Sequence, residues 1–100
     1  HAKDDVHARA LQEARVEGER MLGATETALA ADGDLLEAGE RASIDAELAA
    51  LRAAIGGTDH RAIKSAYDRI NRITEPFAAR RMDRTVRQAL AGRSVETLPS

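Results

Sequence analysis

The chain has 100 residues and a net charge of −2, which suits one small domain. Alanine supplies 21 of the 43 hydrophobic residues, and the other 22 are too few to surround a deep substrate cavity. Two aromatic residues exclude a base-stacking platform, and the lack of cysteine excludes disulfides, a thiolate nucleophile and cysteine-ligated clusters. Because there is no apolar run of the roughly 20 residues that span a membrane and no signal-peptide pattern, we expect a cytoplasmic, all-α protein.

The first predicted helix is the longest. Asp4 or Asp5 can cap it, and no breaker follows until Gly33, so we expect an arm helix over about 4–31. Its larger apolar residues are spaced by five in the front half and tighten after Gly18. We therefore predict a mostly solvated front half and a bundle that begins at about residue 22.

Three shorter helices are predicted to follow the arm. The second begins near Glu37 and ends at Gly56, the third is capped by Thr58 or Asp59, and the fourth ends at Gly92. Each carries one apolar stripe at helical spacing. The stripes are Ile44, Leu48, Leu51 and Ile55; Ile63, Ala66, Tyr67, Ile70 and Ile73; and Phe77, Ala78, Met82, Val86, Ala89 and Leu90.

The connections between these helices are only a few residues long, which predicts antiparallel neighbours. The expected fold is therefore all-α, with the N-terminal arm helix running into an antiparallel bundle of about four helices. The helical domain covers 1–92, the bundle about 22–92, and residues 93–100 are expected to form a flexible tail.

The charge is divided between the two halves of the chain. Residues 1–59 hold six Lys/Arg and thirteen Asp/Glu, whereas residues 60–94 hold nine Lys/Arg and three Asp/Glu. We expect the halves to pack against each other rather than to bind two separate partners. Arg80, Arg84 and Arg87, with Arg81 beside them, could follow nucleic-acid phosphates, but Asp83 interrupts this stripe. A solvated face, or pairing with the acidic half, is the favoured interpretation.

No catalytic or metal site is predicted. His1, His7 and His60 lack the i, i+3 or i+4 spacing that helical metal sites use, and no phosphate loop or serine nucleophile turn is present. The sequence therefore favours a mechanical role or the recognition of a partner, and it predicts no cofactor for this chain.

The order of these elements resembles a known family. A long arm helix, Leu35-Leu36, a striped helix ending in Gly-Gly-Thr-Asp and a third striped helix look like the C-terminal helical lid of 70-kilodalton heat-shock chaperones, the DnaK class. Within that class, segments 28–32 (ALAAD) and 77–83 (FAARRMD) are most similar to the HscA family of iron–sulfur cluster assembly. Glu37 departs from the pattern, where a better helix cap such as serine is expected.

The resemblance implies a longer parent protein with three parts: an ATPase domain using ATP and Mg, a β-sandwich that holds client peptide, and this lid. The implied partners are the parent's own β-sandwich, a client such as an iron–sulfur scaffold protein, and a J-type co-chaperone. This chain would then be no enzyme, since the ATPase domain lies upstream.

In the family, an acidic residue midway along the arm latches to a basic loop of the β-sandwich. Matched from Asp5, that position is Glu19, and Arg20, Met21 and Leu22 follow it in the segment nearest the peptide channel. The alternative is that Glu19 is one of several solvated acids, with Glu13, Glu17 and Glu26.

Two functions stay open: a chaperone lid, or a free-standing helical adaptor that binds a partner protein through its arm. In either case the arm carries four larger apolar residues that a β-sandwich or a second copy could cover. We expect these residues to support a weak homodimer of the isolated chain. They are Val6, Leu11, Val16 and Met21.

Overall fold

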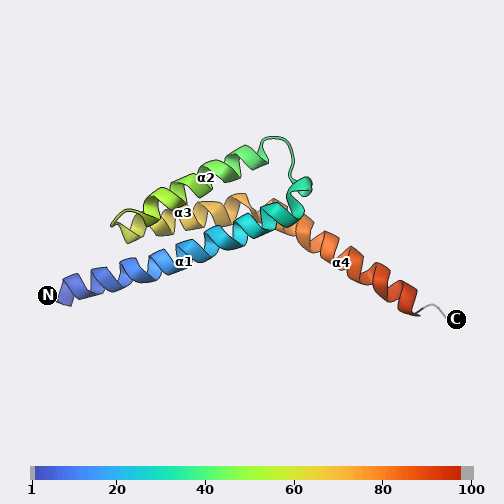
Figure 1. Cartoon of the computed structure of the whole chain (residues 1–100), viewed down its shortest axis with the longest axis horizontal. Coiled ribbons are helices and arrows are strands. Elements are labelled where there is room, and N and C mark those ends of the chain that lie inside the picture. The colour runs from blue at the N-terminus through green and yellow to red at the C-terminus, as the bar shows by residue number, and fades with distance from the viewer. Residues whose placement is uncertain (1, 98–100) are drawn as a thin grey trace.

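A computed structural model describes residues 2–97 of the chain and the side chains of residues 3–92. Its elements are α1 (Ala2–Asp32), a short 3₁₀ turn η1 (Gly33–Leu35), α2 (Glu40–Ile55), α3 (His60–Ile73) and α4 (Glu75–Thr97). The predicted all-α class and long leading helix are confirmed for these residues (Figure 1). The radius of gyration is 18.4 Å, against about 13 Å for a compact domain of this length, so the molecule is elongated.

Helices α1, α2 and α3 lie side by side and form the bundle, with α2 antiparallel to both of its neighbours (Figure 1). The stripes predicted for the second and third helices provide most of the core. Ile44, Leu51 and Ile70 have no exposed surface, and Ile63 is 1% exposed. At roughly 1.5–3 kcal/mol for each fully buried large apolar side chain, these four residues together stabilise the bundle by several kcal/mol.

The bundle begins earlier on α1 than the prediction of residue 22. Leu11 and Ala14 already pack against the core, and Gly18 is buried between α2 and α3. The packed positions follow one face at alternating spacings of three and four residues. They are Leu11, Ala14, Gly18, Met21, Thr25 and Ala28. Several of these side chains are small, so a search for large apolar residues missed the stripe.

Only the first turn of α4 joins the bundle core, through Phe77, whereas the sequence predicted a fourth antiparallel helix along the bundle. One residue, Thr74, separates α3 from α4, and its near-helical backbone (φ −90°, ψ −5°) bends the chain without reversing it. Helix α4 therefore projects from the end of the bundle (Figure 1). Of the predicted apolar stripe only Phe77 is buried, whereas Met82 is 66% exposed.

The end of α4 also differs from the prediction. The helix passes through Gly92 and its backbone is helical to Thr97, because one glycine costs a helix interior only about 1 kcal/mol. The side chains of 93–97, and residues 98–100 altogether, lie outside the described part. The flexibility expected for 93–100 stays a prediction.

The start of α2 lies at Glu40, three residues after the predicted start at Glu37. Gly39 precedes it with φ +83°, in the left-handed region that favours glycine. The Glu37 backbone N–H, ahead of the helix, donates to the carboxylate of Glu40 at 2.6 Å. The Gly56 stop and the Asp59 cap are confirmed, and the Asp59 carboxylate accepts a hydrogen bond from the Arg61 N–H.

Candidate functional site: the arm helix and its contacts

The first seven described side chains of α1, residues 3–9, are all exposed. They extend the helix beyond the segment that packs on α2 and α3, because contacts with the core begin at Leu11. The sequence predicted such a projecting front end, although it placed the boundary about ten residues later. This part of α1 is the free arm of the molecule.

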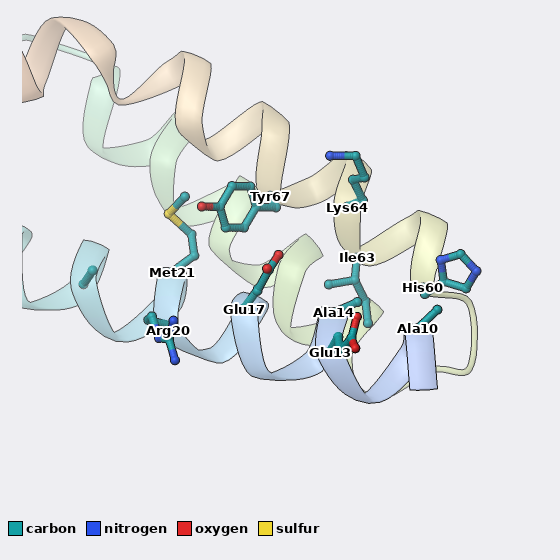
Figure 2. A pocket seen from close by; sticks show the side chains of 11 residues that line it. Ala10, Glu13, Ala14, Glu17, Arg20, Met21, His60, Ile63, Lys64 and Tyr67 are labelled. Atoms are coloured by element: carbon teal, nitrogen blue, oxygen red, sulfur yellow. The ribbon is translucent and has the colours of Figure 1, made fainter. Parts of the chain in front are cut away.

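An open groove of about 510 Å³ runs between α1 and α3, next to the arm (Figure 2). Ile63 and Met21 give it an apolar floor. Glu13 and Glu17 line it from α1, while Lys64 and Tyr67 line it from α3. The α1 wall thus carries two acids and, at its rim, Arg20, while Lys64 places a positive charge on the α3 wall.

Arg15, in the part of α1 that follows the free arm, ties this helix to the end of α2. Its Nε donates to the carbonyl oxygen of Ile55 at 3.1 Å, and its Nη2 donates to that of Gly57 at 2.7 Å. The last carbonyls of a helix have no intrahelical partner and carry the negative end of its dipole. The guanidinium satisfies one of these acceptors, at Ile55, and one carbonyl of the following loop, at Gly57, and so fixes the α1 register against the α2–α3 loop. Arg15 was not predicted as a contact residue, since no local pattern shows which carbonyls it will reach.

The four residues predicted for the latch do not share one environment. Glu19 and Arg20 are exposed, whereas Met21 and Leu22 are half-buried against the bundle core. Arg20 also lines the rim of the α1–α3 groove. No ion pair involves Glu19 among the described side chains, so its carboxylate is open to a partner. Met21 and Leu22 support the bundle instead.

The four apolar arm residues are also divided. Val6 is 66% exposed and Val16 is 44% exposed, so both face water. Leu11 and Met21 pack against the chain's own core. Only Val6 and Val16 remain as candidates for covering by another surface.

Glu26, one of the acids named with Glu19, is exposed but has an ion-pair partner. Its carboxylate pairs with the Arg52 guanidinium of α2. Substitution of Glu26 would therefore disturb an α1–α2 contact.

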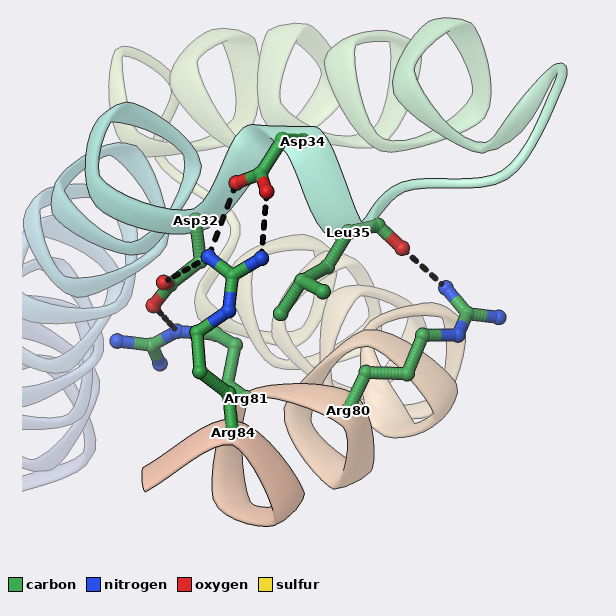
Figure 3. A network of polar contacts seen from close by, with 6 residues as sticks. All are labelled: Asp32, Asp34, Leu35, Arg80, Arg81 and Arg84. Atoms are coloured by element: carbon green, nitrogen blue, oxygen red, sulfur yellow. Dashed lines mark hydrogen bonds and ion pairs between the residues drawn. The ribbon is translucent and has the colours of Figure 1, made fainter. Parts of the chain in front are cut away.

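An ionic cluster joins the start of α4 to the end of α1 (Figure 3). Arg81 donates to Asp32 at 2.8 Å, and Arg84 donates to both Asp32 and Asp34 at 3.0 Å. These pairs fix the direction in which α4 leaves the bundle. They also confirm the expectation that the basic half packs against the acidic half.

Arg80 forms a second part of this cluster. Its guanidinium contacts the Glu40 carboxylate at 2.6 Å and the Glu37 carboxylate at 3.2 Å, and it donates to the carbonyl oxygen of Leu35 at 3.0 Å. Three of the four arginines in the predicted basic stripe are thus engaged with the acidic half. The fourth, Arg87, pairs with Asp83 on α4 itself.

The cluster lowers the pKa of its carboxyl groups. The hydrogen bond from Arg81 lowers the pKa of Asp32, helped by Arg84 and opposed by desolvation. Arg84 likewise lowers the pKa of Asp34, and Arg80 lowers that of Glu40. The carboxylates therefore stay ionised well into mild acid, which keeps the cluster intact at neutral pH.

The described residues contain no group of three or more His, Cys, Asp or Glu side chains placed to hold a metal ion. His7 and His60 approach each other with ring centroids 6.1 Å apart, but they are only two. Within the same part of the chain, no helix is long and apolar enough to cross a membrane.

A long leading helix with an exposed front end, braced by two shorter antiparallel helices, is the architecture that the chaperone-lid resemblance implies. The comparisons with known proteins support the same family resemblance. The chain is 61% identical over 97 residues to the chaperone protein HscA homolog of Ralstonia pickettii (strain 12J), and 59% identical over 97 residues to that of Ralstonia nicotianae. It is 59% identical over 95 residues to the homolog of Azoarcus sp. (strain BH72). No protein-family model matches the chain.

These matches cover 95–97% of the chain but only 15–16% of each relative. The chain spans about a sixth of the length of the curated relatives, within their C-terminal portion. It is therefore similar to the C-terminal region of HscA chaperones, and the predicted resemblance is confirmed. The ATPase domain of such a chaperone is not part of this chain.

Proposed function

We propose that this chain is the lid of a chaperone's substrate-binding domain and closes over bound client peptide. Its parent would be an ATP-dependent chaperone of iron–sulfur protein maturation in the cytoplasm. The partners in this proposal are the parent's own β-sandwich, an iron–sulfur scaffold client and a J-type co-chaperone. ATP and Mg would bind the ATPase domain, outside this chain. A free-standing adaptor is not favoured, since the relatives are chaperones about six times as long.

The observation that carries the proposal is the exposed arm. The side chains of residues 3–9 of α1 are exposed and lie outside the core, with the His7 ring near that of His60, while Arg15 and Gly18 hold the following turns on α2 and α3. A rigid helix anchored at one end and free at the other suits a lever that lies across a neighbouring domain. Val6 on the free segment and Val16 on the anchored segment are both apolar and exposed.

Glu19 is the proposed latch residue. It is exposed and lies on the turn that follows the Gly18 contact, where α1 is firmly held. An acidic side chain on a fixed turn loses little further backbone freedom when it pairs with a basic loop. Such a partly exposed ion pair stabilises the closed lid by up to about 1 kcal/mol.

The test uses the full-length parent with Glu19→Ala. Loss of about 1 kcal/mol corresponds to roughly fivefold faster release of a fluorescent client peptide, expressed mainly in the off-rate. Basal ATP turnover should change much less. High salt should reduce the difference between wild type and variant, since screening already weakens the pair.

Glu17→Ala is the matched control. Glu17 has the same charge, is exposed, and lies two residues away, about 200° around the helix from Glu19. Glu26→Ala is unsuitable because it breaks the pair with Arg52. Equal effects of the Glu19 and Glu17 substitutions on peptide release would refute the latch assignment.

A further inference from the structure

The fold brings two of the three histidines of the chain together. His7 lies on the free arm of α1, and His60 is the first residue of α3, 53 positions further along the chain. Their ring centroids are 6.1 Å apart. His60 also lines the α1–α3 groove, near Ala10 (Figure 2). Helical spacing could not reveal this pair, because the two imidazoles come from different helices.

The distance between the two rings suits a shared metal ion. Zinc binds a histidine nitrogen at about 2.0–2.1 Å, so the centroid of each bound ring lies about 3.2 Å from the ion. In a tetrahedral site two such centroids are therefore about 5 Å apart. The rings of His7 and His60 need to approach by only about 1 Å to reach this geometry. The His7 side chain is exposed and the χ2 torsion of histidine is broad, so a small rotation of the side chain supplies that movement.

The two side chains provide the ligand type that divalent transition metals prefer. Neutral imidazole is the commonest metal ligand in proteins and suits zinc, nickel and copper. The described residues hold no arrangement of three or more His, Cys, Asp or Glu for a metal, so water must fill the remaining positions of an ion shared by His7 and His60. A structural zinc site uses four protein ligands. With two such ligands, binding is weaker than at a structural site, and the ion exchanges with solution.

We propose that His7 and His60 form a two-histidine site for a divalent transition-metal ion such as Zn²⁺, and that the bound ion ties the free arm to the start of α3. The contacts of α1 with the core begin at Leu11. A link at His7 therefore extends the anchored length of α1 by about one helical turn toward its N-terminus. The proposal is independent of the lid function, because both ligands belong to this chain.

Calorimetric titration of the 100-residue chain with zinc chloride at about pH 7.5, where free imidazole is mostly neutral, tests the proposal. His1 lies outside the described residues, so every sample carries His1→Ala, which leaves His7 and His60 as the only histidines. We expect one zinc ion per chain. His7→Gln and His60→Gln should each weaken binding at least about tenfold, because the ion needs both rings. Two independent single-histidine sites would instead leave one site at full affinity in each variant.

His7→Gln combined with Arg9→His is the matched control. This variant keeps two imidazoles but moves one of them two residues along the exposed arm, about 200° around the helix. It should bind zinc no better than His7→Gln alone. The proposal is overturned if zinc does not bind at concentrations up to about 1 mM, if either single variant keeps the original affinity, or if this control binds as tightly as the chain that retains His7.

Amide hydrogen exchange tests whether the ion links the two helices. With free zinc at about ten times its dissociation constant, the population of chains without the link falls about elevenfold. Exchange of the α1 amides around His7 should then slow by about tenfold. His60→Gln changes only α3, yet it should remove this slowing on α1. Unchanged exchange of these amides when zinc is added to the chain with both histidines would rule out the link.

Discussion

Two glycines of α1 should respond in opposite directions to the same substitution. Gly18 and Gly23 both lie inside the helix, where Gly→Ala reduces the backbone entropy of the unfolded chain and stabilises a protein by about 0.5–1 kcal/mol. A methyl group on Gly23 would meet nothing within 4 Å. Gly23→Ala should therefore raise the free energy of unfolding by about that amount.

A methyl group on Gly18 would instead lie 3.0 Å from Cδ1 of Ile55 and 3.2 Å from Cγ2 of Ile63. These contacts are closer than ordinary van der Waals separation and Ile63 is 1% exposed, so α1 must shift outward or the isoleucine side chains must move by a few tenths of an ångström. Overpacking of this kind costs about 1–3 kcal/mol, which exceeds the gain in helix propensity. We expect Gly18→Ala to lower the free energy of unfolding by about 1 kcal/mol.

Urea unfolding followed by circular dichroism at 222 nm measures both variants against wild type. The predicted separation between them is about 2 kcal/mol. With an m-value near 1 kcal/mol/M, as expected for a small protein, the two midpoints should differ by about 2 M. Equal stabilisation by the two substitutions would show that Gly18 is not a tight contact, and the packing of α1 on α2 and α3 would need revision.

The remaining predictions concern the polar contacts. Arg15→Met keeps an unbranched apolar stem but removes two hydrogen bonds, so it should lower the free energy of unfolding by about 1–3 kcal/mol. It should also speed amide exchange around Gly57, whereas the exposed control Arg20→Met should change neither quantity. Low pH should release the start of α4 from its ion pairs with the end of α1. The pKa of Asp32 lies below its ordinary 3.8 in the folded chain, so its stabilising contribution is complete above about pH 4 and is lost as pH falls through the lowered value. Small-angle scattering should therefore show a changed radius of gyration once the pH is taken below the lowered pKa, and Asp32→Asn should reproduce the change at pH 7. No change in either sample would contradict the role of the cluster in fixing the direction of α4.

The sequence by itself determined most of the secondary structure. The stripes ending at Ile55 and Ile73 required two amphipathic helices, and Gly56 and Asp59 marked the turn between them correctly because these end signals are local. The separation of charge also predicted that the basic half would meet the acidic half. The resemblance to chaperone lids depended on segments such as 77–83, and the relatives confirm it.

The candidate latch shows where sequence reasoning stopped. The sequence placed Glu19 and Met21 together on the arm, but helical periodicity alone does not say which side of a helix its neighbours will cover. Tertiary packing put Met21 on the core and left Glu19 in water. Arg15 was missed for the same reason, since its two acceptors lie 40 and 42 residues away.

Only the tertiary structure decided where the bundle begins and where it ends. It begins early because Gly18 lets α1 approach α2 and α3 closely, and close approach depends on the surfaces of three helices at once. It ends before α4 because Thr74 alone joins α3 to α4 and keeps a near-helical backbone, so the chain bends where two or more non-helical residues would have let it reverse. Amphipathic periodicity requires that an apolar face be covered, but it does not specify by what. For Ile44 and Ile70 the cover is the chain's own core, whereas Val86 remains in water.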